Sequence, residues 1–309
     1  MTAVRARLIL NPAAGDDTAD DRAVALNERL SSGFGAMEIV LTSGRGDAEA
    51  AARRAVSDGC NMLLIGGGDG TLNEVLNGVV LEGALSSMTF GIIPLGTGND
   101  FAKALGLPLD VDQALSMLLR NHRIQVDVGR VNGRCFVNTS GAGFIAEVSE
   151  AVTPQMKTIA GRLAYLVGGA QALMEFEPVE MSLSTVPGSH AFNTKMYAFA
   201  ACNAPMIGGG RLIAPHALID DGLLDFCVIE GMPALEFVAL LRRVATGEHV
   251  EDSRVRYFQS AKASVRFERE ILINTDGEIL PARSCEYDVL PQAATFLAGD
   301  SYLAAVGNR

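Results

Sequence analysis

The first 122 residues alternate short apolar runs with stretches of helical periodicity, and this alternation constrains the fold more than any other feature. Strand-like runs occupy residues 7–10, 37–41, 61–65 and 90–93, and candidate helices lie between them at 20–30, 48–58 and 71–79. Strands that alternate with helices form mostly parallel sheets covered by helices. We therefore expect an α/β N-terminal domain with a mostly parallel sheet over residues 1–123.

The pattern changes from about residue 124. Asn132-Gly133 separates two strand-like runs and is the pair that best fits a type I′ hairpin turn. Further strand-like runs lie at 196–201, 224–229, 255–259, 263–267 and 271–274, with helical segments expected near 160–176 and 235–246. This density predicts a β-rich, largely antiparallel domain over residues 124–291.

Length and charge limit the class of protein. A chain of 309 residues exceeds the usual size of one compact core, which favours two domains. The net charge of -11 argues against a nucleic-acid binder and against constitutive polybasic docking to membranes. The longest apolar stretch, 163–174, is too short to span a bilayer, the N-terminus lacks a signal-peptide core, and the cysteines are scattered singly. We expect a cytoplasmic protein with reduced cysteines.

The strongest chemical signal is the segment GGGDGTLNE, residues 66–74, between an apolar strand and an amphipathic helix. Glycines let a phosphate approach the main chain, and a helix N-terminus offers unpaired N–H donors. The segment lacks the lysine of a P-loop and the third glycine of GxGxxG. The competing interpretation is a strained strand-to-helix turn with Thr71 near the N-cap. Asp69 favours the phosphate site, because a carboxylate there would repel phosphate unless it held a cation or met a transferable proton.

Two further strand ends should open onto the same edge of the sheet. PLGTGNDFA, residues 94–102, follows the next strand and leads into another helix. Consecutive strands of a parallel sheet end at one edge, so this loop should lie beside the first. NPAAG, residues 11–15, follows the first strand and would place Asn11 on that edge, although alone it is an ordinary turn.

In this order and at these spacings, the three segments resemble the catalytic domain of the diacylglycerol kinase family. The similarity is strongest to the bacterial soluble lipid kinases related to sphingosine and ceramide kinases. It extends over essentially the whole chain through NTSGAG (138–143), GGGRLIAPHA (208–217), IDDGLL (219–224) and NTDGE (274–278). The resemblance implies a nucleotide in the cleft between the two domains, and a C-terminal tail, 292–309, that packs back on the first domain.

The resemblance also implies the residues of the site. ATP contacts are expected from Thr42, Gly67, Gly68, Asp69, Gly70, Thr71, Leu72, Asn73 and Thr97, with Asn11 a further candidate. Glu278 is implied as the proton acceptor. A divalent cation, usually Mg²⁺ and with Ca²⁺ as the alternative, is implied at the Leu218 carbonyl, the Asp221 carboxylate and the Leu223 carbonyl. Oxygen ligands suit such a hard cation, although Asp220-Asp221-Gly222 by itself is typical of a plain acidic turn.

One departure concerns the end of the first segment. This chain has Ala14 and Asp16 where the family often has Ser and then a basic residue, so a phosphate contact could be lost there. Arg45 or Arg211 could supply positive charge instead, and a solvated surface role is an equal alternative for Arg45.

The expected reaction is phosphoryl transfer from ATP-Mg²⁺, lying across the glycine loops, to a lipid hydroxyl that approaches from the second domain. Glu278 would accept the proton while Asp69 positions the metal or the γ-phosphate. Alignment and charge neutralisation suffice for this chemistry, and no covalent intermediate is required. Asp276 is a third carboxylate that could act as the base, or it could orient other groups.

Three other classes of protein share some of these features. An NAD kinase shares the GGDGT loop, but the intact PLGTGNDFA segment argues against it. A dehydrogenase would rest on GAGFIA, residues 141–146, which lacks the following acidic residue and is interpreted as a turn of the β-rich domain. A non-catalytic nucleotide or lipid sensor would not need to retain Asp69, Asp276 and Glu278.

The expected partners are ATP and a lipid with a free hydroxyl, with transient peripheral membrane contact and a homodimer left open. The apolar stretch 159–174 could line a lipid cleft, but a core helix is the favoured interpretation.

Overall fold

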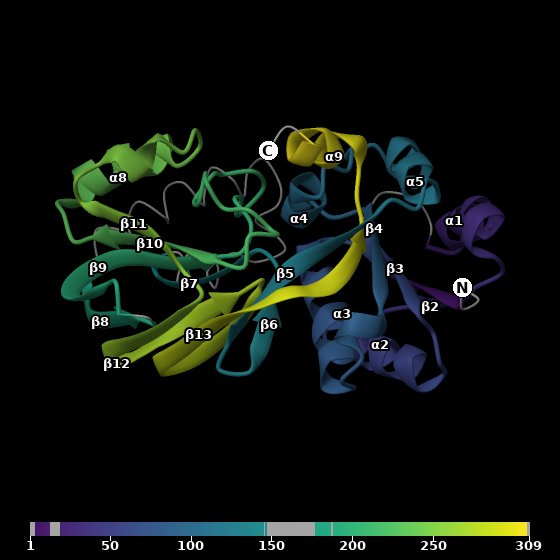
Figure 1. Ribbon diagram of the computed structural model, residues 1–309, viewed down its shortest axis with the longest axis horizontal. Helices are drawn as coiled ribbons and strands as arrows, with labels where there is room; N and C mark the ends of the chain where they lie inside the picture. The colour runs from purple at the N-terminus through teal and green to yellow at the C-terminus, as the bar shows by residue number, and fades with distance from the viewer. Residues whose placement is uncertain (1–3, 13–18, 145, 147–176, 187, 308–309) are drawn as a thin grey trace.

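The computed structural model describes residues 4–12, 19–144, 146, 177–186 and 188–307. Its described strands form one hydrogen-bonded sheet of 13 strands along the long axis of the molecule (Figure 1). Two separate clusters of buried apolar side chains pack against the sheet, one in the N-terminal half and one in the C-terminal half. The predicted two-domain architecture with a β-rich C-terminal region is confirmed.

The strands of the N-terminal half pair in parallel in the order β2-β1-β3-β4. They are β1 (Ala6–Leu10), β2 (Glu38–Leu41), β3 (Met62–Gly67) and β4 (Thr89–Pro94). Every residue of β1, β3 and β4 is buried, whereas the edge strand β2 is partly exposed. Continuous apolar runs of this kind arise because helices cover both faces of the central strands.

Helices lie on both faces of these strands, with α2 and α3 together on one side and α4 and α5 on the other (Figure 1). The helices of this half are α1 (Ala19–Phe34), α2 (Asp47–Ser57), α3 (Asp69–Leu81), α4 (Asp100–Ala104) and α5 (Val111–Leu119), with a 3-10 turn η1 (Leu85–Ser87). α2 approaches α3 closely at Gly78, where an added Cβ would lie 2.5 Å from the Glu49 carbonyl oxygen. This packing holds α3, whose first turn carries the glycine-rich segment.

The C-terminal half is almost entirely antiparallel. Its strands are β5 (Arg123–Val131), β6 (Arg134–Phe136), β7 (Thr139–Gly143), β8 (Val179–Thr185), β9 (Ala191–Cys202), β10 (Leu224–Glu230), β11 (Val255–Ser260), β12 (Lys262–Thr275) and β13 (Glu278–Leu297). Asn132 and Gly133 have φ angles of 47° and 89°, and Val131 pairs with Arg134 across them. The predicted two-residue hairpin is confirmed, with the left-handed backbone that a type I′ turn requires.

One expectation for this half was wrong, and another is confirmed as part of a longer strand. The runs 263–267 and 271–274 belong to one strand, β12, whose pairing with β13 shifts register between Arg266 and Ile271. Gly141 to Gly143 lie in strand β7, antiparallel to β9 and β12, and not in a turn. Small residues suit this strand because the backbones approach closely: a Cβ on Gly143 would lie 2.6 Å from the Tyr197 carbonyl oxygen.

The helical part of this half is small. The helix expected at 235–246 is present as α8 (Ala234–Arg243) and is followed by a 3-10 turn η3 (Glu248–Glu251). The helix expected near 160–176, and with it the apolar stretch 159–174, lies outside the described residues.

Strand β13 connects the two halves. It pairs antiparallel with β12 and β5, and then Thr295 and Phe296 pair in parallel with β4. The Phe296 ring packs against Phe90 and Phe101, with centroids 5.0 and 5.1 Å away. Helix α9 (Asp300–Gly307) follows beside α4 (Figure 1). The end of the chain is thus part of the N-terminal core.

None of the described helices is both long and apolar enough to cross a membrane. All five cysteines are free thiols, and four of them are buried.

Candidate active site

The two glycine-rich loops lie side by side at the end of the parallel strands. Gly67 and Pro94 pair at the ends of β3 and β4, so the loops leave the sheet at the same level. A Cβ added to Gly96 would lie only 2.4 Å from the Cα of Gly68. The loops therefore touch backbone to backbone, and only glycine fits at this contact.

The turn after β1 joins the same edge. Asn11 donates its backbone N–H to the Gly66 carbonyl at 2.8 Å and its side-chain Nδ2 to Thr71 Oγ1 at 3.3 Å. Thr42, buried at the end of β2, donates its backbone N–H to the Leu10 carbonyl at 2.9 Å. Ala14 and Asp16, where the chain departs from the family pattern, lie outside the described residues.

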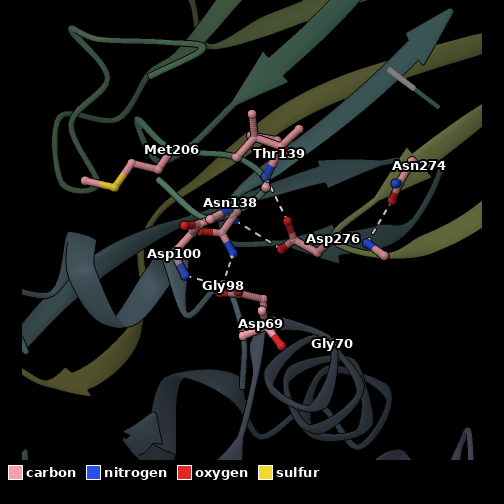
Figure 2. A pocket seen from close by; sticks show the side chains of 14 residues that line it. Asp69, Gly70, Gly98, Asp100, Asn138, Thr139, Met206, Asn274 and Asp276 are labelled. Carbon is pink, nitrogen blue, oxygen red and sulfur yellow. Dashed lines mark hydrogen bonds between the residues drawn. The ribbon is translucent and has the colours of Figure 1, made fainter. Parts of the chain in front are cut away.

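Asp69 connects the first loop to the second. This residue begins α3, and its carboxylate accepts the backbone N–H groups of Asp100 and Phe101 at 3.1 Å each (Figure 2). These donors are the first of α4, where a carboxylate satisfies unpaired N–H groups and the helix dipole. Asn138 Nδ2, from the C-terminal half, donates to Asp69 Oδ1 at 3.3 Å. One carboxylate thus ties together both loops and the β-rich half.

Asp100 connects α4 to the glycine turn at 208–210. Its Oδ2 accepts the Gly209 N–H at 2.8 Å, and Lys103 Nζ donates to its Oδ1 at 3.0 Å. Gly208, Gly209 and Gly210 all have positive φ angles, of 61°, 91° and 105°. Sequence reasoning missed Asp100 and Asn138 as site residues, although both stand in segments that carried the resemblance.

A cavity of about 400 Å³ opens between the loops and the β-rich half (Figure 2). It is lined by Asp69, Gly70, Thr97, Gly98, Asp100, Asn138, Thr139, Met206, Ile207, Gly208, Gly209, Asn274, Asp276 and Gly277. The glycine-loop residues form one wall, and Asp276 faces them from the other.

Asp276 stands in the tight turn between β12 and β13, with a φ angle of 46°. Burial, the largest influence, and the nearby charge of Asp69 together raise the pKa of the Asp276 carboxyl to about 7. Opposing this, the carboxylate accepts the backbone N–H groups of Val137, Asn138 and Thr139 at 2.8, 3.1 and 2.8 Å. Asp276 is therefore firmly held and close to its titration point at neutral pH.

Glu278 lies in an adjoining cavity of about 330 Å³ and not in the first one. This second cavity is lined by Arg45, Gly46, Glu49, Gly70, Asn73, Glu74, Arg134, Asp276, Gly277 and Glu278. Arg134 Nε donates to Glu278 Oε2 at 2.9 Å. The two cavities share Gly70, Asp276 and Gly277. The candidate carboxylates Asp69 and Glu278 thus line two different cavities, which meet at Asp276.

Leu72 and Asn73 face inward from the glycine-rich segment. The Leu72 side chain is 2% exposed, and its N–H donates to the Gly68 carbonyl at 3.1 Å. Asn73 Nδ2 donates to the carbonyls of Thr275 and Asp276 at 3.0 and 3.4 Å. Leu72 thus supports the site from behind, whereas Asn73 lines the second cavity and holds α3 to the turn that carries Asp276.

The two arginines that could supply positive charge to the site lie in different places. Arg45 lines the second cavity. Arg211 Nη1 instead donates to the Gly208 carbonyl at 2.7 Å and braces the glycine turn.

The implied cation site forms an acidic corner between β5, the 218–223 loop and β10. Burial raises the pKa of Asp221, and the neighbouring charges of Asp225, Asp127 and Asp220 raise it further. A bound cation would relieve this repulsion, so the oxygen donors present fit a hard divalent ion. Within the described chain, no group of three or more His, Cys, Asp or Glu side chains is arranged to hold a metal, so binding here would depend on the two carbonyls.

Asp127 shapes this corner. It is fully buried, and its carboxylate accepts the N–H groups of Gly222 and Gln292 at 2.6 and 2.7 Å. The 218–223 loop is therefore held against the start of the C-terminal tail. The Tyr302 hydroxyl of α9 donates to Asp220 Oδ2 at 2.7 Å, which is a second contact between this loop and the C-terminal tail.

Two known domain families match most of the chain. Residues 5–131 match the diacylglycerol kinase catalytic domain, and residues 138–298 match the YegS C-terminal NAD kinase beta sandwich-like domain. The diacylglycerol kinase of Bacillus subtilis is 30% identical over 275 residues, 89% of each chain. A protein of Shewanella frigidimarina named probable lipid kinase YegS-like is 32% identical over 244 residues, 79% of this chain and 78% of the other.

The crystal structure of a diacylglycerol kinase from Bacillus anthracis has the same fold, with a TM-score of 0.74, 22% identity, and coverage of 98% of this chain and 99% of the other. The fold and the paired glycine loops define a two-domain nucleotide-dependent kinase architecture. The chain belongs to the diacylglycerol kinase family, in the bacterial branch that joins the catalytic domain to a YegS-type C-terminal domain. For this family, ATP and a divalent metal are implied.

Proposed function

We propose that the protein is an ATP-dependent lipid kinase that transfers the γ-phosphoryl group to a hydroxyl of a lipid such as diacylglycerol. One observation carries the proposal: Asp69 holds the two glycine loops together while Asp276 faces them across the cavity. Backbone donors beside Asp69 on one wall and the Asp276 carboxylate on the other suit a phosphate chain and an attacking alcohol. The matched relatives are named for this activity.

The nucleotide phosphates would lie over Gly68, Gly70 and Thr97, with Thr42 and Asn11 at the side of β1. The remaining candidate contacts, Gly67, Asp69, Thr71, Leu72 and Asn73, would shape the loop and the first turn of α3. Mg²⁺ that accompanies ATP neutralises phosphate charge. Because phosphoryl transfer needs mainly alignment and neutralisation, such a rigid cradle is sufficient.

Glu278 would accept the proton of the acceptor hydroxyl as the hydroxyl oxygen bonds to the γ-phosphorus and ADP leaves. Asp276 is less suited to this role, because three backbone N–H groups engage its carboxylate. It would instead hold Asn138 and Thr139 in place beside Asp69. In this division of roles, Asp69 and Asp276 align the reactants and Glu278 moves the proton.

The Leu218 carbonyl, the Asp221 carboxylate and the Leu223 carbonyl would hold Mg²⁺ in preference to Ca²⁺. There the ion would offset the charge of neighbouring aspartates and stabilise the loop next to α9. This role is structural and lies outside the transfer step.

The apolar part of the acceptor would lie beside Met206 and Ile207, which line the first cavity. Its hydroxyl would lie where the two cavities meet, at Gly70, Asp276 and Gly277, and so on the side of Glu278. We place the reaction in the cytoplasm, where ATP is available, with transient peripheral contact to the lipid surface. The proposal is compatible with a homodimer, which light scattering would test.

Incubation with ATP and either diacylglycerol or NAD, followed by mass spectrometry of the products, tests the function. We expect a phosphorylated lipid with wild-type protein. Formation of NADP in place of phosphorylated lipid would show that the protein is an NAD kinase. The C-terminal domain family is itself described as NAD kinase beta sandwich-like. ATP binding without turnover across a broad lipid panel would assign a sensor.

A further inference from the structure

Arg134 lies between two carboxylates that come from opposite halves of the molecule. Its Nε and Nη2 contact Glu278 Oε2, at the start of β13, at 2.9 and 2.6 Å. Its Nη1 and Nη2 also reach Glu49 Oε2, on α2, at 3.3 and 3.4 Å. The Arg134 side chain is 30% exposed and lines the second cavity with both glutamates. Arg134 is thus a partly buried positive charge in direct contact with Glu278, the proposed base.

The contact is selective for one oxygen of Glu278. Both nitrogens of Arg134 meet Oε2, and within the described chain no hydrogen bond to Oε1 is found. A guanidinium is planar and presents its donors in a fixed fork, so it sets the direction of a carboxylate that it binds. Oε1 is left available to another donor, such as an alcohol.

The charges around Glu278 make such a cation useful. Glu49, Glu74 and Asp276 line the same cavity, and Arg45 and Arg134 are its positively charged residues. An incoming nucleotide would add further negative charge. Without Arg134, Glu278 would be repelled by these groups and free to turn from the acceptor.

We propose that Arg134 is a positioning residue for phosphoryl transfer, which holds Oε2 of Glu278 so that Oε1 meets the acceptor hydroxyl. This inference rests on the proposed function, in which Glu278 accepts the proton. Arg134 touches neither the phosphorus nor the hydroxyl and acts only through Glu278.

The chain offers a matched control. Arg130, on β5 of the same hairpin, forms an ion pair with Asp288 of β13, with a Nε to Oδ1 distance of 2.9 Å. Neither Arg130 nor Asp288 lines the cavities of the site. Arg130→Gln therefore removes the same charge and a similar contact between the hairpin and β13, but leaves Glu278 untouched.

A double-mutant cycle tests the proposal, with kcat and the KM for ATP measured for wild type, R134Q, E278Q, R134Q/E278Q, R134K and R130Q. The loss of a charge-assisted hydrogen bond that acts in the transition state predicts that kcat of R134Q falls about 10-fold or more with little change in KM. R134Q should cost nothing further in the E278Q background, R134K should recover part of kcat, and R130Q should match wild type.

Independent effects that multiply in the double variant would overturn the inference, as would an unchanged kcat in R134Q or an equal loss in R130Q. If wild type is active and E278Q retains full kcat, the assignment of the base is wrong, and the role of Arg134 falls with it. If wild type phosphorylates no lipid, the proposed function itself fails. Thermal unfolding of each variant separates loss of fold from loss of activity. If R134Q does not fold, the kcat of R134K, which keeps the charge, tests the inference in its place.

Discussion

The Asp69 carboxylate accepts the backbone N–H of Asp100 at 3.1 Å, which joins the start of α3 to the start of α4. These two residues are 31 positions apart in the chain, yet each stands at the first turn of a helix that follows a glycine loop. The contact fixes the spacing between the loops. A phosphate cradle needs this spacing, because its N–H donors must converge on one ligand.

Asp69→Asn keeps the size of the side chain but replaces one acceptor oxygen with a donor that faces a backbone N–H. We expect a loss of about 1–2 kcal/mol in the free energy of unfolding, as for a lost helix cap, together with a severe loss of kinase activity. Urea unfolding and steady-state kinetics measure the two effects.

Asp110→Ala is the control for stability, because Asp110 caps α5 by accepting the Gln113 N–H at 2.9 Å and lines neither cavity of the site, and alanine removes this cap. It should lose similar stability and retain activity. Equal activity losses in the two variants would show that Asp69 acts only through stability.

The titration of Asp276 predicts a pH-dependent stability. Burial raises the pKa of Asp276 to about 7 in the folded protein, whereas the ordinary pKa of an aspartate is 3.8. Between these values the folded state holds a proton that the unfolded state has released, so the contribution of Asp276 to stability falls as pH rises. It is most favourable below pH 4 and levels off above pH 7.

Asp276→Asn isolates this contribution. The stability of wild type relative to the variant, measured by urea unfolding, should decrease between pH 5 and pH 8. A difference that is constant, or that grows with pH, would show that the backbone donors outweigh burial and that Asp276 is ionised throughout this range.

Gly96→Ala tests the contact between the loops. The added methyl group would lie 2.4 Å from the Gly68 Cα, so the loops must separate. We expect a loss of about 1–3 kcal/mol in stability, as for other overpacked sites, and a raised KM for ATP. Gly70→Ala is the contrasting variant: a Cβ there meets nothing within 4 Å, and Gly70 lies within α3. Its stability should rise by about 0.5–1 kcal/mol, and a destabilised G70A would contradict the geometry of the loop.

Met206→Gln tests the apolar wall of the first cavity. Removal of an apolar contact with the acceptor should raise the KM for diacylglycerol by about 10-fold, since burial of such a side chain contributes about 1.5–3 kcal/mol. The KM for ATP should not change. Leu235→Gln serves as the control, because Leu235 is 85% exposed on α8. A rise in the KM for ATP in place of that for lipid would move the acceptor away from Met206.

Local patterns predicted the elements that carry the site. The strands before the glycine loops appear as continuous apolar runs, and Asn132-Gly133 specifies its hairpin through its own backbone preferences. Asp69 could be predicted as a site residue because a carboxylate among phosphate-binding glycines would repel the phosphate unless it held a cation or met a transferable proton. These inferences need only residues that are neighbours in the chain.

Other parts depend on contacts between distant residues. Arg134 and Glu278 are separated by 144 positions, and no periodicity in the chain brings them together. The same holds for Asn138 and Asp69, 69 positions apart. Tertiary packing sets the register shift between β12 and β13 and the pairing of β13 with β4. The local sequence predicts that each segment is a strand, but not which strand it pairs with.

Single-turnover transfer from ATP to diacylglycerol, compared between wild type and Glu278→Gln, tests the central claim most directly. The glutamine keeps the shape of the side chain and can still contact Arg134, but it cannot accept the proton. We predict a fall of about 10²- to 10⁴-fold in the rate of phosphoryl transfer, with ATP binding retained. A variant that transfers the phosphoryl group at the wild-type rate would contradict the account.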